Sequence, residues 1–436
     1  MARITRILLE CTSTFENDIN TGIQRVVRNI VQESRQFAND CSLDIVPVIS
    51  KYGRFWKMEE KQNRFIYYKT LCLAKLKKLY GKIRPAIMKL SPAGTLEKWI
   101  FASVGYVSTS LLNAIFWPFT ITAYYKRRIV IHKNDMVLLL DSSWIYPIWP
   151  AVRYAKERGA TVGLVVYDII QITHHQYFCG AITDRFANWF NTAIHEVDFC
   201  VAISQTVQKE IQKYVAAKYP SHKLIEKNNF FVLGSAMDKI AVKTDVREEV
   251  NEAFNGNNDS GIYLVVGTIE PRKNYGYLLD VFERVWKEFP SSRLCIVGRT
   301  GWQCEDFVQK FKSHPLYAKS LYMFNDLSDA ELDYCYSHAK SLIFPSHAEG
   351  FGLPIVEALF KGLPVLASDI PIFREIGKDF CTYFDQTNPA SLANIICKIE
   401  KDGKMPPVCQ PEQYHLASWA DSCRELLTKS LELSRN

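Results

Sequence analysis

The sequence predicts an α/β protein with two doubly wound, Rossmann-like domains, and three observations support this prediction. The chain has 436 residues, and a single hydrophobic core rarely extends past roughly 250–300 residues. Continuous apolar strands alternate with helical segments, which is typical of parallel sheets covered on both faces. This alternation stops at a polar, Asn-rich break over 251–261 and then restarts.

The first half of the chain begins with a predicted buried strand at 4–12. Gly22 then opens a helix over 23–37, in which Ile and Val recur at helical spacing. A second strand at 43–50 completes a β-α-β unit. The remaining elements expected in this half are strands at 135–143, 161–168, 199–205 and 229–235 and a helix over 150–159.

The second half repeats the pattern. Strands are predicted at 261–268, 292–298, 341–346 and 363–369, and helices at 274–289, 329–339, 353–362 and 414–433. This alternation predicts a second doubly wound domain. We therefore expect domains over 1–240 and 241–415, followed by a C-terminal helix within 416–436.

Residues 52–134 interrupt the first domain and carry an unusual charge pattern. Between 51 and 133, 17 Lys and Arg stand against three Glu, a net charge of +14, whereas the rest of the chain carries −7. A basic amphipathic segment at 70–90 precedes 27 uncharged residues at 99–125. We favour a segment that lies on an anionic membrane surface. A locally packed subdomain and a bilayer span, which needs about 20 apolar residues, are the alternatives.

The cysteines and the first residues bear on the compartment. Twelve cysteines are scattered without a C-x-x-C pair, which indicates neither a zinc site nor a disulfide framework. A reducing compartment fits this usage, and the first residues resemble a strand more than a signal peptide. Together with the basic interruption, these features predict a cytoplasmic protein, peripheral at the inner face of the cytoplasmic membrane.

The strongest functional signal is HAEGFGLPIVE, residues 347–357, between a predicted strand and a predicted helix. Gly350 and Gly352 permit close backbone approach, and Pro354 suits the first turn of a helix. The backbone N–H groups of Phe351, Gly352 and Leu353, together with the helix dipole, then form an anion site.

Two carboxylates flank this anion site, Glu349 on one side and Glu357 on the other. A carboxylate can accept hydrogen bonds from a sugar diol, so the expected ligand is a nucleotide sugar. Arg272 and Lys273 follow another predicted strand, within VVGTIEPRKN, where open α/β sheets bind ligands. They are suited to neutralise a diphosphate. Glu349 alone, or the Arg272–Lys273 pair alone, is also compatible with solvated loop charges. Together they predict one site.

These motifs resemble a known family. Glu349 to Glu357 is similar to the E-x7-E motif of retaining glycosyltransferases of family 4, and Gly267 to Asn274 is similar to the diphosphate loop of that family. The resemblance covers residues 260–380. It is weaker over the first domain, where TGIQRVV matches the glycine turn at Gly22, and it is absent over 52–134.

The resemblance implies a GT-B fold, in which two Rossmann-like domains face each other across a cleft and the last helix crosses back. It implies an acceptor on the first domain and a nucleotide-sugar donor on the second. By this resemblance Glu349 lies near the donor hexose, Glu357 holds the ribose, and Arg272 and Lys273 stabilise the leaving diphosphate. The turn at Gly22 closes over the diphosphate.

The implied reaction is a front-face substitution with retention. No D-x-D motif is present, so neither a metal nor another cofactor is expected, and no nucleic-acid partner is predicted. At the end of the strand over 161–168, Tyr167 stands before the catalytic candidate Asp168 where many family members carry a histidine. We expect Tyr167 to hydrogen-bond the donor, or His174 to take over that role. Thr268 replaces a basic residue of many relatives.

The favoured function is transfer of a hexose, mannose in the members most resembled, to a lipid-linked or polysaccharide acceptor in O-antigen, capsule or lipopolysaccharide synthesis. The departures at Tyr167 and Thr268 leave a catalytically silent, donor-binding GT-B scaffold as the alternative. An epimerase of the same fold is a third possibility, although an epimerase would not need a basic, membrane-facing interruption.

Overall fold

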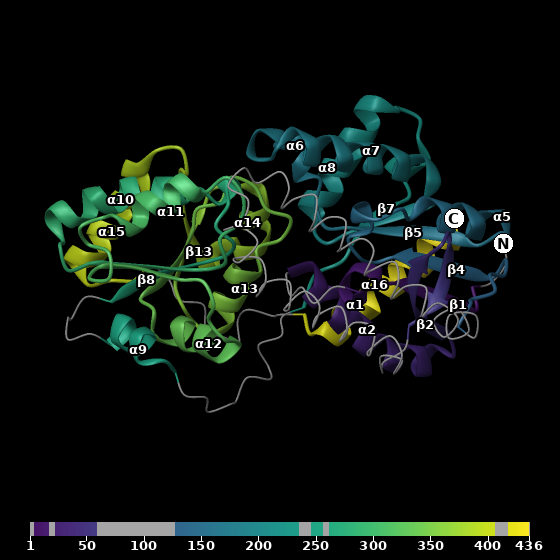
Figure 1. The fold of residues 1–436 in the computed structure, drawn as a ribbon, viewed down its shortest axis with the longest axis horizontal. Helices are drawn as coiled ribbons and strands as arrows, with labels where there is room; N and C mark the ends of the chain where they lie inside the picture. Colours follow the sequence, from purple (N-terminus) through teal and green to yellow (C-terminus); the bar gives the residue numbers. More distant parts are fainter. Residues whose placement is uncertain are drawn as a thin grey trace, which may run out of the picture.

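The computed structural model describes residues 4–16, 22–58, 127–234, 246–255, 261–405 and 417–435. These residues form two α/β domains, which Figure 1 shows next to each other. The segments at 70–90 and 99–125 lie outside the described residues, so membrane contact stays a prediction. Among the helices that are described, none is long and apolar enough to cross a bilayer.

The first domain is built on a sheet whose described strands follow the order β3-β2-β1-β4-β5-β6-β7. All neighbours pair in parallel except β3, which runs antiparallel to β2 at the edge. The strands are β1 (Arg6–Glu10), β2 (Asp44–Lys51), β3 (Arg54–Lys57), β4 (Asp135–Leu139), β5 (Thr161–Val166), β6 (Phe199–Ala202) and β7 (Asn228–Phe230). Because β3 belongs to this sheet, the interruption of the domain begins after β3 and not at residue 52.

The second sheet is wholly parallel over its described strands, in the order β10-β9-β8-β11-β12-β13. Counted along the chain of this domain, that is the 3-2-1-4-5-6 order of a dinucleotide-binding fold. The strands are β8 (Ile262–Val266), β9 (Arg293–Val297), β10 (Leu321–Phe324), β11 (Ser341–Phe344), β12 (Val365–Ser368) and β13 (Cys381–Phe384). The two doubly wound domains confirm the predicted fold class.

Helices cover both faces of each sheet, which is why the central strands are buried along their whole length. Those of the first domain are α1 (Thr12–Glu16), α2 (Gly22–Cys41), α5 (Trp149–Glu157), α6 (Ile170–Thr173), α7 (Gly180–Glu196) and α8 (Gln205–Lys218). Those of the second are α9 (Glu248–Asn255), α10 (Tyr275–Glu288), α11 (Glu305–Lys312), α12 (Asp329–His338), α13 (Leu353–Phe360), α14 (Pro371–Gly377) and α15 (Pro389–Asp402). The prediction of a polar break from residue 251 was wrong for its first residues, because α9 continues to Asn255.

The last helix, α16 (Trp419–Arg435), crosses back to the first domain. Figure 1 shows it, in yellow, next to α1 and α2, and it packs against α2, β6 and β7. The Ser422 hydroxyl donates to the carbonyl oxygen of Val232 at 2.6 Å, and Lys429 Nζ donates to that of Phe230 at 2.6 Å. The first domain is therefore completed by residues that follow the second domain in the chain.

Candidate functional site

The candidate site lies at the carboxyl ends of the central strands of the second domain. β8 and β11 are neighbours, but the chain leaves them in opposite directions along the sheet, toward β9 and toward β12. Open α/β sheets form a crevice at such a switch point. The loop after β8 carries Arg272 and Lys273, and the loop after β11 carries Glu349, so the two sequence motifs meet at this crevice.

A cavity of about 550 Å³ lies here, between the two domains. Nine of the eleven predicted site residues line it: Gly22, Tyr167, Asp168, Arg272, Lys273, Glu349, Phe351, Gly352 and Leu353. His174 and Glu357 are not among its lining residues. The structure thus brings most of the predicted site together on one cavity.

The charged residues of the cavity form one compact cluster. Arg272 Nη1 lies 2.7 Å from Glu349 Oε2, and Lys273 Nζ pairs with Glu349 Oε1. Arg272 Nε also lies 2.6 Å from Glu270 Oε1. Two carboxylates therefore balance two cations, and all four side chains are largely buried. A diphosphate that enters the cavity would have to share these cations with Glu349.

The electrostatics of the cluster follow from burial and pairing. Burial alone would raise the pKa of Glu349, but Arg272 and Lys273 hold it at about 2. Burial lowers the pKa of Lys273 and is opposed chiefly by Glu349. Across the cavity, burial raises the pKa of Asp168, although Arg272 works against this. Glu349 is therefore an ion at neutral pH, held in place by both cations.

Two glycines let the Glu349 turn approach the first domain. A side chain at Gly350 would collide with the carbonyl oxygen of Tyr167. Gly352 has φ +112°, which a residue with a side chain rarely adopts, and it directly precedes α13. The turn between Glu349 and α13 therefore depends on glycine at both positions.

The first domain supplies the opposite wall of the cavity. Gly22 begins α2 and lies against the Leu353 side chain, which places the predicted glycine turn beside the start of α13. Asp168 follows β5, and its Oδ1 accepts a hydrogen bond from the backbone N–H of Ile170 at 3.1 Å. Asp168 thus faces the charged cluster from the other side of the cavity.

The structure does not support a donor contact through the hydroxyl of Tyr167 or through His174. The Tyr167 hydroxyl donates to the carbonyl oxygen of Leu140 at 2.8 Å, inside the first domain. The His174 ring stacks on Tyr177, whose ring stacks in turn on His347 with 5.1 Å between the centroids. The contact between the domains at this point is therefore made by Tyr177, on which His174 stacks, and His174 is not among the residues that line the cavity.

Glu357 is buried on α13, and both of its oxygens already have partners. Arg25 of the first domain donates to Oε1 at 2.9 Å, and the Tyr336 hydroxyl donates to Oε2 at 2.8 Å. A ribose that bound Glu357 would have to share its oxygens with Arg25 and Tyr336 or displace one of them. Ribose recognition by Glu357 therefore stays a prediction.

The first domain buries a second group of carboxyls at the corresponding place in its own sheet, where β1 and β4 end. Glu10 Oε1 accepts hydrogen bonds from the Thr12 N–H at 2.8 Å and from the Tyr146 hydroxyl at 2.6 Å. Asp141 Oδ2 accepts from the Thr14 N–H at 2.6 Å. Burial is the main cause, and the nearby charge of Asp141 the second, of a rise in the pKa of Glu10 to about 7.

Sequence reasoning missed several of these residues. Glu270 lies between the recognised residues of the GTIEPRKN motif, and its position beside two cations was a usable signal. Arg25 lies in TGIQRVV, but nothing in the local sequence pairs it with a glutamate 332 positions away. Glu10 gave only the signal of a carboxylate at the end of an otherwise apolar strand.

Within the described ranges, no group of three or more His, Cys, Asp or Glu side chains is arranged to hold a metal ion. Among the described residues that line the cavity, Arg272 and Lys273 carry the positive charges.

Parts of the chain are similar to known proteins. Residues 246–415 match the family model of glycosyl transferases group 1. Serotype-specific mannosyltransferase WbdA of Escherichia coli is 28% identical over 313 residues, which cover 70% of this chain and 38% of WbdA. O-antigen chain mannosyltransferase RfbU of Salmonella typhimurium is 31% identical over 175 residues, 38% of this chain and 48% of RfbU. The chain thus spans less than two fifths of the length of WbdA.

Solved structures show the fold. A glycosyltransferase from Rickettsia africae matches all of this chain and all of its own, with a TM-score of 0.57 at 14% identity. Anabaena HepE, solved with UDP and glucose, has a TM-score of 0.53 at 12% identity and covers 99% of this chain and 96% of its own. The fold is therefore GT-B.

Proposed function

We propose that the chain is a retaining, metal-independent glycosyltransferase that moves a hexose, mannose, from a nucleotide-sugar donor to a lipid-linked or polysaccharide acceptor in surface-glycan synthesis. The observation that carries the proposal is the cluster of Arg272, Lys273 and Glu349 at the switch point of the second sheet, in a cavity that the first domain closes. The similarity to the O-antigen mannosyltransferases supports the choice of sugar and of pathway class.

In the proposed reaction, the bond between the anomeric carbon of the hexose and the diphosphate oxygen breaks. A bond from the same carbon to an acceptor hydroxyl forms on the same face of the sugar. The hydroxyl proton passes to the departing phosphate oxygen. Negative charge develops on the diphosphate oxygen as its bond to the anomeric carbon breaks, before the proton arrives, and stabilisation of such charge is often the largest contribution of a protein to the rate.

The side chains have separate proposed roles. Arg272 and Lys273 receive the charge that develops on the diphosphate. Glu349, an ion at neutral pH, orients both cations and lies where the hexose hydroxyls would bind. Asp168 faces them from the first domain, where the acceptor would approach.

The proposal is tested first by nucleotide binding. The melting temperature is measured with GDP, UDP, GDP-mannose and UDP-hexoses, because only a ligand that binds the folded state raises it. Transfer from labelled donors to membrane lipid extract is then measured with and without EDTA. Stabilisation by GDP-mannose and EDTA-insensitive transfer are expected, and loss of transfer in EDTA would disprove metal independence.

A catalytically silent donor-binding scaffold is the second candidate. The observation that favours it is the Tyr167 hydroxyl, whose hydrogen is donated to the Leu140 carbonyl inside the first domain and not toward the charged cluster. Donor stabilisation without transfer to any lipid extract would favour the scaffold. Peripheral attachment through residues 70–128 is tested with anionic vesicles in rising salt, which should release the protein if the attraction is electrostatic.

A further inference from the structure

Helix α8 of the first domain begins at a carboxylate that the second domain supplies. Glu375, on α14, accepts at Oε1 from the Gln205 N–H at 2.8 Å and at Oε2 from the Thr206 N–H at 2.7 Å. The Thr206 hydroxyl also donates to Oε2 at 2.6 Å. The first N–H groups of a helix have no partner within the helix, and negative charge is favourable there. Glu375 therefore caps α8 from across the domain boundary.

The same end of α8 also holds the Glu349 turn. Ser204, the residue before α8, accepts from the Val207 N–H at 3.2 Å and donates through its hydroxyl to the carbonyl oxygen of Gly350 at 3.0 Å. Gly350 in turn is packed against the carbonyl of Tyr167. A shift of α8 relative to the second domain would therefore move the contacts of the residue that follows Glu349.

We infer that Glu375 is a positioning residue, which fixes the first domain at the position where Ser204 and Tyr167 hold the Glu349 turn against the charged cluster. Domains within one chain move relative to each other unless their interface prevents it. A single carboxylate that accepts three hydrogen bonds from one helix turn fixes both a distance and an orientation. Its effect on turnover rests on the proposed function, whereas its effect on the domain arrangement does not.

The geometry predicts how substitutions at this contact behave. Glu375→Gln keeps the size of the side chain, but its amide NH2 replaces one acceptor and then faces an N–H donor of α8. Thr206→Val removes only the hydroxyl donor and keeps the backbone contacts. The first change should loosen the domain contact strongly and the second weakly.

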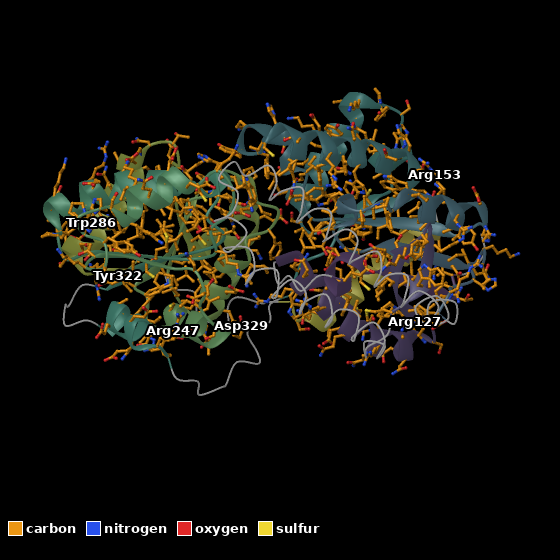
Figure 2. All side chains as sticks on the ribbon, viewed as in Figure 1. Arg127, Arg153, Arg247, Trp286, Tyr322 and Asp329 are labelled. Carbon is orange, nitrogen blue, oxygen red and sulfur yellow. The ribbon has the colours of Figure 1, made fainter. Side chains whose placement is uncertain are left out.

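Glu331 offers a matched control in the second domain. It belongs to the capping box at the start of its own helix, α12, where it accepts from the Ser328 N–H at 2.8 Å, and it also accepts from Arg247 Nε at 2.6 Å. Its partner Arg247 lies on the part of the second domain that carries α9 and α12, away from the first domain (Figure 2). Glu331→Gln therefore removes a helix cap without touching the domain contact.

The experiment measures small-angle X-ray scattering, the melting temperature, GDP and UDP affinity, and turnover for wild type and the three variants. Glu375→Gln should increase the radius of gyration and lower turnover at least about tenfold, with nucleotide affinity nearly unchanged because Arg272 and Lys273 lie in the second domain. Thr206→Val should shift the same quantities less. Glu331→Gln should lower only the melting temperature.

The inference is overturned if Glu375→Gln and Thr206→Val keep the wild-type scattering curve, or if Glu331→Gln changes scattering and turnover as much as Glu375→Gln does. Absence of nucleotide binding and transfer in the wild-type protein would instead disprove the proposed function. The scattering comparison would then still decide whether Glu375 sets the arrangement of the domains.

Discussion

The two domains bury carboxyl groups at the same place in their sheets but neutralise them differently. In the first domain, Glu10 is surrounded by hydrogen-bond donors and another acid, and its pKa rises to about 7. In the second, Glu349 lies between Arg272 and Lys273, and its pKa falls to about 2. Burial is nearly complete for both side chains, so burial alone does not decide whether a buried carboxyl is charged. The presence of a cation decides it.

The largest effect is expected from Glu349→Gln, which leaves two buried cations without their common partner. Removal of one member of a buried ion pair costs about 3–5 kcal/mol of unfolding free energy, and denaturant titration at neutral pH measures it. The pKa of Glu349 is lowered, so its stabilisation is complete above its ordinary value of 4.5 and is lost as pH falls toward 2. The difference between wild type and variant should shrink over that range. Asp369→Asn, which breaks an exposed pair with Arg374, should cost little at any pH.

Lys273→Met tests whether the cations of the charged cluster around Glu349 serve the reaction. Loss of one group that stabilises the charge on the departing diphosphate should lower turnover about 10²–10³-fold, measured with a labelled donor. Lys340→Met is the matched control, because Lys340 forms a partly buried pair with Glu400 at 2.9 Å in the same domain. Equal turnover in the two variants would remove Lys273 from the proposed site.

Glu10→Gln tests the buried carboxyl group of the first domain through the pH dependence of stability. The raised pKa means that the folded state favours the protonated carboxyl, so the wild-type protein loses stability as pH rises from 4.5 through about 7. The variant has no such charge. Relative to it, wild type should therefore be less stable at pH 8 than at pH 5, by at most about 3 kcal/mol. A stability difference that does not change with pH would show that Glu10 is not held protonated.

Tyr146→Phe should give the smallest effect, about 1 kcal/mol at pH 5. It removes the hydroxyl that donates to Glu10 Oε1 at 2.6 Å. This hydrogen bond favours the charged form of Glu10, so its loss should move the pH dependence of stability to higher pH. A midpoint that moves to lower pH would contradict the assigned donor direction.

Local sequence was sufficient to predict the parts of the molecule that depend on neighbours in the chain. The buried strands and the grouping of Arg272, Lys273 and Glu349 follow from apolar runs and from loops at strand ends. The helix α9 was predictable and was missed, since Val250, Ala253 and Phe254 are buried at helical spacing within a polar stretch.

Contacts between the domains could not be predicted in this way. Arg25 pairs with Glu357 across 332 positions, and Thr206 with Glu375 across 169. Each partner taken alone resembles an ordinary charged or polar helix residue. Only the packing of one domain on the other decides that the two meet, and no periodicity in either segment carries that information.

The return of α16 to the first domain has a consequence for synthesis. Cys423, Leu426 and Leu427 of α16 are buried, and the Cys423 thiol contacts the carbonyl of Ile30 on α2. During translation α2 leaves the ribosome early, and the residues that cover it emerge only after the whole second domain has been made. A nascent chain therefore exposes the part of α2 that α16 later covers throughout that interval. It is in this interval that the chain most needs protection from aggregation.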